Sequence, residues 1–166
     1  MQKNPIFRLT TAAVFMALVL VATMVVQIPI PLGYAHLGDA VILLSALVLS
    51  RRYAVFAASV GSMLADFITG FAIWCVPTLI IKSILTLIAI GIFRSSLSQK
   101  RLLGGFFSML FMTIGYTVAG AVLFDSAALG LASAPGLAME GVVNIVAFLF
   151  LAKLLSPVLK KIDFHE

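Results

Sequence analysis

The sequence predicts an all-α membrane protein with six transmembrane helices in one compact bundle and cytoplasmic N- and C-termini. Of its 166 residues, 63% are hydrophobic and only 10% are charged, and the mean hydropathy is +1.21. Such a chain cannot cover a water-soluble globule with a polar surface. Few polar residues separate the apolar stretches, so we expect a single transmembrane domain over residues 1–166 without an attached soluble domain.

Six apolar segments account for most of the chain. They cover about residues 9–27, 36–50, 53–70, 72–93, 102–124 and 136–156. Most approach the roughly 20 residues that a helix needs to cross a bilayer, whereas the second is short and is expected to be buried within the bundle. In the third segment, Ala57, Gly61 and Ala65 are spaced four residues apart and form a small-residue face that permits close helix packing.

Prolines mark several of the predicted helix boundaries. Pro29 and Pro31 exclude a helix from the link after the first segment and favour extended backbone, which is either a lid over the outer mouth or an ordinary linker. Pro77 lies inside the fourth apolar segment, so this helix either begins there or is broken there. Pro135 is expected near the start of the sixth helix, with Ser133 as the residue that caps it.

The Lys and Arg residues fall into two groups. Ten of the eleven lie beside the apolar segments or, in the case of Lys153, near the end of the last one: Lys3, Arg8, Arg51, Arg52, Arg94, Lys100, Arg101, Lys153, Lys160 and Lys161. Positive charge next to spanning helices stays on the cytoplasmic side, which places both termini inside. We therefore expect the first segment to be a retained span and not a cleaved signal peptide. The eleventh cation, Lys82, is alone within an apolar segment.

Composition also excludes or disfavours several functions. The net charge of +5 is divided among separate links without interleaved aromatic residues, so the expected partner is the lipid bilayer and not nucleic acid. With Cys75 as the single cysteine and two histidines, no metal centre is expected. The GxSxG, HExxH and Walker A patterns are absent from the sequence, so we expect no enzyme activity and no cofactor. Any ATP-driven step would then belong to another subunit.

Polar and aromatic side chains at similar depths predict a ligand site in the outer half of the bundle. The predicted site residues are Lys82, Asp66, Asn144, His36, Asp39, Trp74, Tyr116 and Tyr34. Lys82 should lie roughly 8 to 13 Å, and Asp66 roughly 6 Å, below the outer ends of their helices, so the two side chains can meet or share a ligand. Ionisable groups in a bilayer are costly unless they are paired or hydrated, which indicates a ligand pocket.

Structural roles remain open for several of these residues. Lys82 and Asp66 are also consistent with a purely structural ion pair. Asp39 is also consistent with a helix-terminal role, together with His36, because a carboxylate in a first turn interacts favourably with the helix dipole. Trp74 and Tyr34 are also consistent with positions in the belt of aromatic residues at the membrane interface. Glu140 is expected at a helix end or facing the surface, and not in contact with a ligand.

Three motifs follow one another along the chain. They are His36-Leu-Gly-Asp39-Ala, then Gly61-Ser-Met-Leu-Ala-Asp66 followed by Gly70, then Pro77-Thr-Leu-Ile-Ile-Lys82. In this order they resemble segments of energy-coupling factor (ECF) transporter S components, the membrane-embedded vitamin-binding subunits, and the resemblance covers essentially the whole chain. The motif combination is most similar to members linked to hydroxymethylpyrimidine or pyridoxine.

The resemblance implies a function and a set of partners. The chain would be a multi-pass protein of a prokaryotic cell membrane that captures a small vitamin or precursor from outside. It would then dock onto a transmembrane coupling subunit (T component) with two ATPase subunits and topple in the membrane to release the vitamin inside. In that family an Ala-x-x-x-Ala face on the first helix contacts the coupling subunit, and Ala13-Val-Phe-Met-Ala17 matches it, so Ala13 and Ala17 are the implied coupling residues.

Two other function classes remain as alternatives. The first is a stand-alone, proton-coupled secondary transporter of a small polar solute, in which Asp66 or Glu140 relays protons. The second is a small membrane enzyme that uses Asp39 and Asp66 as acid and base, although the sequence shows neither a nucleophile motif nor a metal motif for it.

Overall fold

The computed structural model describes residues 5–159, so Lys3, Lys160 and Lys161 lie outside the described residues. Its helices are α1 (Pro5–Val25), α2 (Gly38–Val48), α3 (Arg51–Ile68), α4 (Cys75–Phe93), α5 (Lys100–Leu123), α6 (Ala127–Leu154) and the short α7 (Ser156–Leu159). A 3-10 turn over Ala72–Trp74 leads into α4. Strand β1 (Ile28–Ile30) pairs antiparallel with β2 (Gly33–Ala35), forming a hairpin between α1 and α2.

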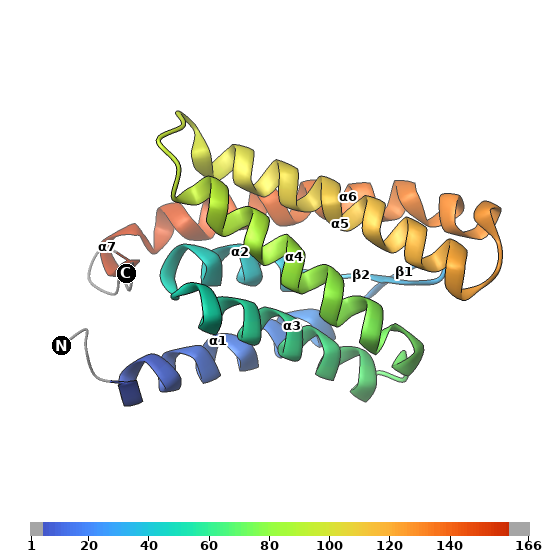
Figure 1. Cartoon of the computed structure of the whole chain (residues 1–166), viewed down its shortest axis with the longest axis horizontal. Coiled ribbons are helices and arrows are strands. Elements are labelled where there is room, and N and C mark those ends of the chain that lie inside the picture. The colour runs from blue at the N-terminus through green and yellow to red at the C-terminus, as the bar shows by residue number, and fades with distance from the viewer. Residues whose placement is uncertain (1–4, 160–166) are drawn as a thin grey trace.

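The long helices run side by side along one axis, and the short α2 lies among them (Figure 1). α2 contacts α1, α3, α4 and α6. It has 11 residues, most of which are buried. A helix that is apolar on all sides belongs in an interior. The prediction that the short second segment is buried within the bundle is therefore confirmed.

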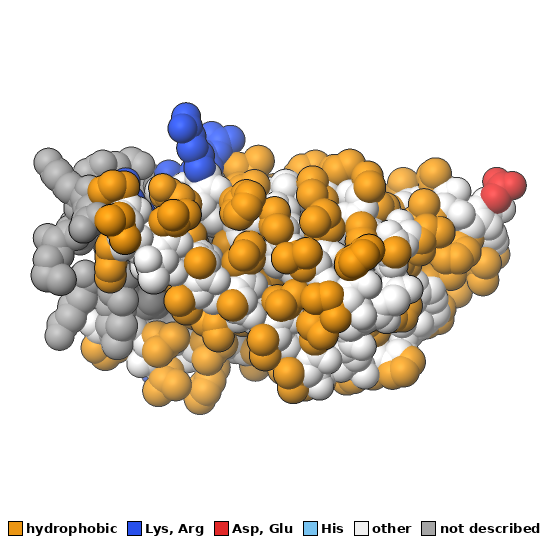
Figure 2. Space-filling model, turned by 90° about the horizontal axis from the view of Figure 1, so that it is seen from below, with side chains coloured by type: hydrophobic (Ala, Val, Ile, Leu, Met, Phe, Trp, Pro, Cys, Tyr) orange, Lys and Arg blue, Asp and Glu red, His pale blue; other side chains and the backbone are white. Residues whose placement is uncertain are grey.

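Four helices are long and apolar enough to cross a membrane among the residues that the structure describes. They cover Pro5–Val25, Ala72–Phe93, Lys100–Leu123 and Ala127–Leu154. Hydrophobic side chains cover most of the visible middle of the molecule in Figure 2. α2 is too short to cross a membrane, and α3 is too polar for such a span because it carries Arg51, Arg52 and Asp66 within 18 residues. Each predicted apolar segment contains one helix, whereas six complete spans remain a prediction.

The link between α1 and α2 departs from the all-α prediction. Two prolines prevent a helix there, as expected, but the extended backbone closes into the β1–β2 hairpin. Pro77 is the third residue of α4. Of the two alternatives for Pro77, the structure shows a helix that begins next to it, where its missing N–H costs little.

The predicted start of the sixth helix is wrong. α6 begins at Ala127, and the side chain of Ser126 caps it by accepting a hydrogen bond from a backbone N–H of the first turn. Pro135 lies inside the helix, and the Ser133 hydroxyl donates to the carbonyl of Gly130 at 2.7 Å. The residues before Pro135 are mostly alanine and leucine, which favour a helix, and their propensity outweighs the proline.

The small-residue face of α3 packs against α1, which confirms the predicted close packing. Ala57, Gly61 and Ala65 are all buried. A Cβ atom added at Gly61 would lie 2.9 Å from the carbonyl oxygen of Met16 and 3.2 Å from Val19. Any larger residue at this position would separate the two helices. The same contact orients the remaining surface of α1 away from the bundle.

Candidate ligand-binding site

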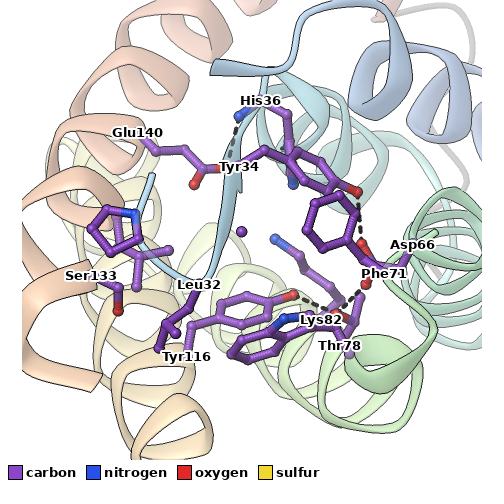
Figure 3. A pocket seen from close by; sticks show the side chains of 14 residues that line it. Leu32, Tyr34, His36, Asp66, Phe71, Thr78, Lys82, Tyr116, Ser133 and Glu140 are labelled. Carbon is purple, nitrogen blue, oxygen red and sulfur yellow. Dashed lines mark hydrogen bonds and ion pairs between the residues drawn. The ribbon is translucent and has the colours of Figure 1, made fainter. Parts of the chain in front are cut away.

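One end of the bundle carries the β1–β2 hairpin and the α3–α4 and α5–α6 turns (Figure 1), and a cavity lies there (Figure 3). We call this the hairpin end. The cavity is lined by Pro31, Leu32, Gly33, Tyr34, His36, Asp66, Phe71, Trp74, Thr78, Lys82, Tyr116, Ser133, Leu137 and Glu140.

Lys82 forms a buried ion pair with Asp39. Its Nζ atom donates to Asp39 Oδ1 at 2.6 Å, and the two side chains are 1% and 0% exposed. Nζ also lies 5.1 Å from the ring centroid of Tyr116. Of the alternatives for Lys82 and Asp66, a direct ion pair is wrong, because Asp39 pairs with Lys82 from the start of α2. A ligand shared by Lys82 and Asp66, which both line the cavity, stays a prediction. An ammonium group has three N–H donors, so donors remain for a ligand in the cavity.

Asp66 is held by hydroxyl groups and not by Lys82. Tyr34 donates to Asp66 Oδ1 at 2.7 Å, and Thr78 donates to Asp66 Oδ2 at 2.5 Å. Tyr116 in turn donates to the Thr78 hydroxyl at 3.0 Å. Figure 3 shows this hydrogen-bonded chain along one side of the cavity. It connects β2, α3, α4 and α5, so Asp66 positions the wall of the cavity.

Asn144 lies behind the wall of the cavity and does not line it. It is 0% exposed, and its Nδ2 atom donates to the backbone carbonyls of His36 at 2.7 Å and Glu140 at 3.0 Å. Its Oδ1 atom accepts from the backbone N–H of Ala40 at 2.8 Å. The structure thus places Asn144 and Asp39 as supports beneath the cavity, although the sequence predicts both as ligand contacts.

Glu140 is buried, so the expectation that it faces the surface or ends a helix is wrong. Glu140 is 5% exposed and lies in the middle of α6. It also lines the cavity. Glu140 Oε1 accepts from the backbone N–H of His36 at 3.3 Å. A signal for this was present in the sequence, because Glu140 precedes Asn144 by four residues and so shares its helix face.

Aromatic rings form much of the remaining wall. Trp74 packs against Tyr116 with 5.7 Å between ring centroids, and Tyr34 packs edge-on against Phe71 at 4.9 Å. Trp74 is only 7% exposed, which does not fit a position in an interfacial belt. Flat hydrophobic faces beside polar groups suit a ligand with a planar ring.

The hairpin closes one side of the cavity and rests on two glycines. A Cβ atom at Gly120 of α5 would lie 2.9 Å from Leu32 Cδ1, and one at Gly136 of α6 would lie 2.7 Å from Ile30 Cγ2. Leu32 has a backbone φ of 70°, a left-handed conformation that is uncommon for leucine. This placement against the cavity favours the lid interpretation of the link over an ordinary linker.

Ala13 and Ala17 lie away from the cavity, on the exposed side of α1. Ala12 and Val19 of the same helix are buried. A shallow apolar groove between α1 and α3 includes Ala13, Met16 and Phe56. The ligand cavity and this surface therefore occupy separate parts of the molecule.

The buried imidazole of His36 should make the stability of the protein depend on pH. It lies between β2 and α2, outside the four apolar spans, and its Nδ1 atom accepts from the Gly38 N–H at 3.1 Å, which assigns the ring proton to Nε2. Burial chiefly, and then the charge of Lys82, lower the pKa of His36 to about 4. Between pH 6.5 and 4 the imidazole of His36 is protonated more readily in the unfolded chain than in the folded protein. The contribution of His36 to the free energy of unfolding is therefore fully present above pH 6.5 and decreases by up to about 3 kcal/mol as the pH falls to 4.

Thermal denaturation in detergent from pH 7.5 to pH 4 measures this effect. His36→Asn keeps an acceptor for the Gly38 N–H and removes the titrating ring. Because Glu140, Asp39 and Lys82 also face this region, the difference between wild type and variant isolates the imidazole. A variant whose melting temperature declines as steeply as that of wild type would contradict the prediction.

Comparisons with known proteins give a family and one relative. A family model described as "ECF-type riboflavin transporter, S component" matches residues 3–160. A protein of Pyrococcus woesei, described as "Uncharacterized protein in gap 3'region", is 38% identical over 109 residues, which are 64% of this chain and 73% of that protein. The family match includes all the helices that line the cavity as well as α1.

Proposed function

The chain belongs to the family of ECF-type riboflavin transporter S components, and from this we propose that its cavity captures a small, water-soluble, heteroaromatic vitamin or vitamin precursor. ECF S components are membrane-integral transporter subunits and not enzymes. We propose that the T component and two ATPase subunits supply coupling and ATP hydrolysis to this chain. The surface around Ala13 and Ala17 would contact the coupling subunit.

The mixed polar and aromatic cavity is the observation that carries this proposal. Its wall combines the ammonium of Lys82 and the carboxylate of Glu140 with the rings of Trp74, Tyr34 and Tyr116. Such sites use apolar walls for affinity and a few placed polar groups for orientation. A planar heterocycle with hydrogen-bonding ring atoms matches both features. Riboflavin, named in the family description, and hydroxymethylpyrimidine or pyridoxine, suggested by the motifs, all belong to this class.

The distribution of charge supports a membrane orientation for the proposed function. The α2–α3 turn with Arg51 and Arg52 and the α4–α5 link with Arg94 and Lys100 lie at the end opposite the hairpin (Figure 1). Figure 2 likewise shows Lys and Arg side chains toward one end and an acidic side chain at the other. By the positive-inside rule, we propose that the basic end is cytoplasmic and that the cavity opens toward the outside.

Binding measurements on the purified chain test the proposal. We expect at least one of riboflavin, pyridoxine, thiamine and hydroxymethylpyrimidine to raise the melting temperature and to bind in titration calorimetry. If no B vitamin or precursor in a full panel binds or stabilises the protein, the proposed function is wrong. Vesicles that contain the isolated chain, with a pH gradient and without ATP, should show no accumulation, whereas accumulation would support the secondary-transporter alternative.

A further inference from the structure

The ionisable groups around the cavity are mostly acidic. Lys82 is the one cation that lines it among the described residues, whereas Asp66 and Glu140 line it and Asp39 lies directly behind Lys82. His36 is neutral at physiological pH because burial lowers its pKa to about 4. Three carboxyl groups thus accompany one ammonium group in a buried region, where unpaired charge is costly.

Two of the three carboxyl groups have partners that account for their charge. Asp39 pairs with Lys82 at 2.6 Å and lies in the first turn of α2, where the helix dipole favours a negative charge. Asp66 accepts a hydrogen bond from a hydroxyl group at each of its oxygens, and such hydrogen bonds stabilise an ionised carboxylate. Asp66 is thus satisfied at both oxygens. Asp39 is paired with a cation through Oδ1, and its Oδ2 atom, which has no hydrogen-bond partner, lies behind Lys82 in a residue that does not line the cavity.

Glu140 lacks comparable partners. Its neighbours are the backbone N–H of His36 at 3.3 Å and His36 Nδ1 at 3.4 Å, but Nδ1 already accepts from Gly38 and so offers no proton. Glu140 lies well inside α6, far from the positive end of that helix. Its side chain is 3% exposed, and Figure 3 shows it extending from α6 toward the cavity from a different wall than Lys82. Its second oxygen is available to a ligand.

The aromatic residues around the cavity favour the same kind of ligand. The faces of aromatic rings attract cations, and the attraction increases when the site is dry. Tyr116 already has Lys82 over its ring. Trp74, Tyr34 and Phe71 contribute further rings to the wall.

We infer that Glu140 determines specificity and that the cavity selects a heteroaromatic ligand whose ring or substituent carries a positive charge. Its cationic N–H group, or its quaternary ring nitrogen, lies beside Glu140, and an acceptor on the opposite edge of the ring receives an N–H of Lys82. This inference rests on the proposed function and deepens it, because a positively charged group is the partner that favours the ionised form of a buried carboxyl group, whereas a net-neutral ring such as isoalloxazine offers none.

Two pairs of closely related probes test the inference on the whole chain in detergent. The pairs are pyridoxamine with net-neutral pyridoxine, and thiamine with its neutral oxidation product thiochrome; riboflavin is a further neutral probe. A hydrogen bond to a charged group contributes enough that the cationic member of a pair should bind about tenfold or more tightly at pH 7. Tighter binding of the neutral members, or of riboflavin alone, overturns the inference while leaving the proposed function intact.

Glu140→Gln removes the charge and keeps the size and the acceptor for the His36 N–H. In this variant the cationic member of each probe pair should bind no more than about threefold more tightly than the neutral member. The affinity for the neutral member should be retained, because the substitution removes only the interaction between the carboxylate and the positive charge. Asp125→Asn is the matched control, since Asp125 is an exposed carboxylate at the hairpin end that does not line the cavity. Unchanged preference in Glu140→Gln, or an equal loss in Asp125→Asn, overturns the inference. Failure of every probe and vitamin to bind wild type would instead overturn the proposed function.

Discussion

Lys82→Met should destabilise the protein by about 3 to 5 kcal/mol, because removal of one partner leaves a buried charge without compensation. Asp39 is 0% exposed, and its Oδ2 atom already lacks a hydrogen-bond partner. The loss of Lys82 would leave its Oδ1 atom without a cation as well. Ligand binding should also be lost, because the ammonium donors that face the cavity disappear. Thermal denaturation and titration calorimetry measure the two losses separately.

A second variant separates stability from binding. In Asp39→Asn/Lys82→Met both charges are absent, and removal of a whole buried pair is often neutral or stabilising. We expect most of the stability to return and the binding defect to persist. Lys153→Met, at an exposed position near the end of α6, is the control and should change neither quantity. If the double variant binds ligand as wild type does, Lys82 has a purely structural role.

Replacement of Ala13 and Ala17 by tryptophan should abolish co-purification with the coupling module and leave ligand binding intact. Both alanines are exposed on α1. Small residues allow helices to approach closely, and two indole rings would hold a partner helix away from this face. The fold should tolerate the change, because both side chains are exposed.

Co-expression with the T component and the ATPases, followed by affinity purification, measures this effect. We expect more than about a tenfold loss of recovered complex for the double variant, equivalent to more than about 1.4 kcal/mol. Ala138→Trp is the matched control, since Ala138 is an exposed alanine on α6. Ala13→Trp/Ala17→Trp that still co-purifies would show that this face is not the coupling surface.

The sequence predicts the helices of this protein better than it predicts their contacts. Apolar runs and flanking charges locate each helix, because they depend on neighbouring residues. The Lys82–Asp39 pair joins residues 43 positions apart, and its geometry depends on how α2 sits between α3, α4 and α6. Depth along a helix suggested Asp66 as the partner, but depth alone does not give the rotation of a helix about its axis.

Glu140 shows a different limit of prediction. The four-residue spacing to Asn144 already placed both residues on one face of the helix. The incorrect start predicted for the sixth helix made Glu140 part of its first turns, where a carboxylate is usual. With the true start at Ala127, the same residue lies in mid-helix and is buried. A boundary error of nine residues thus changed the interpretation of a site residue.

The two glycines beneath the hairpin have a consequence for kinetics. Gly120 and Gly136 receive Leu32 and Ile30, and neither glycine belongs to the wall of the cavity. The release of two apolar side chains would therefore set how fast a ligand enters and leaves, and the wall would set how tightly it is held. Exchange rate and affinity would then reside in different residues, so residence time could change through the glycines without altering which molecule is selected.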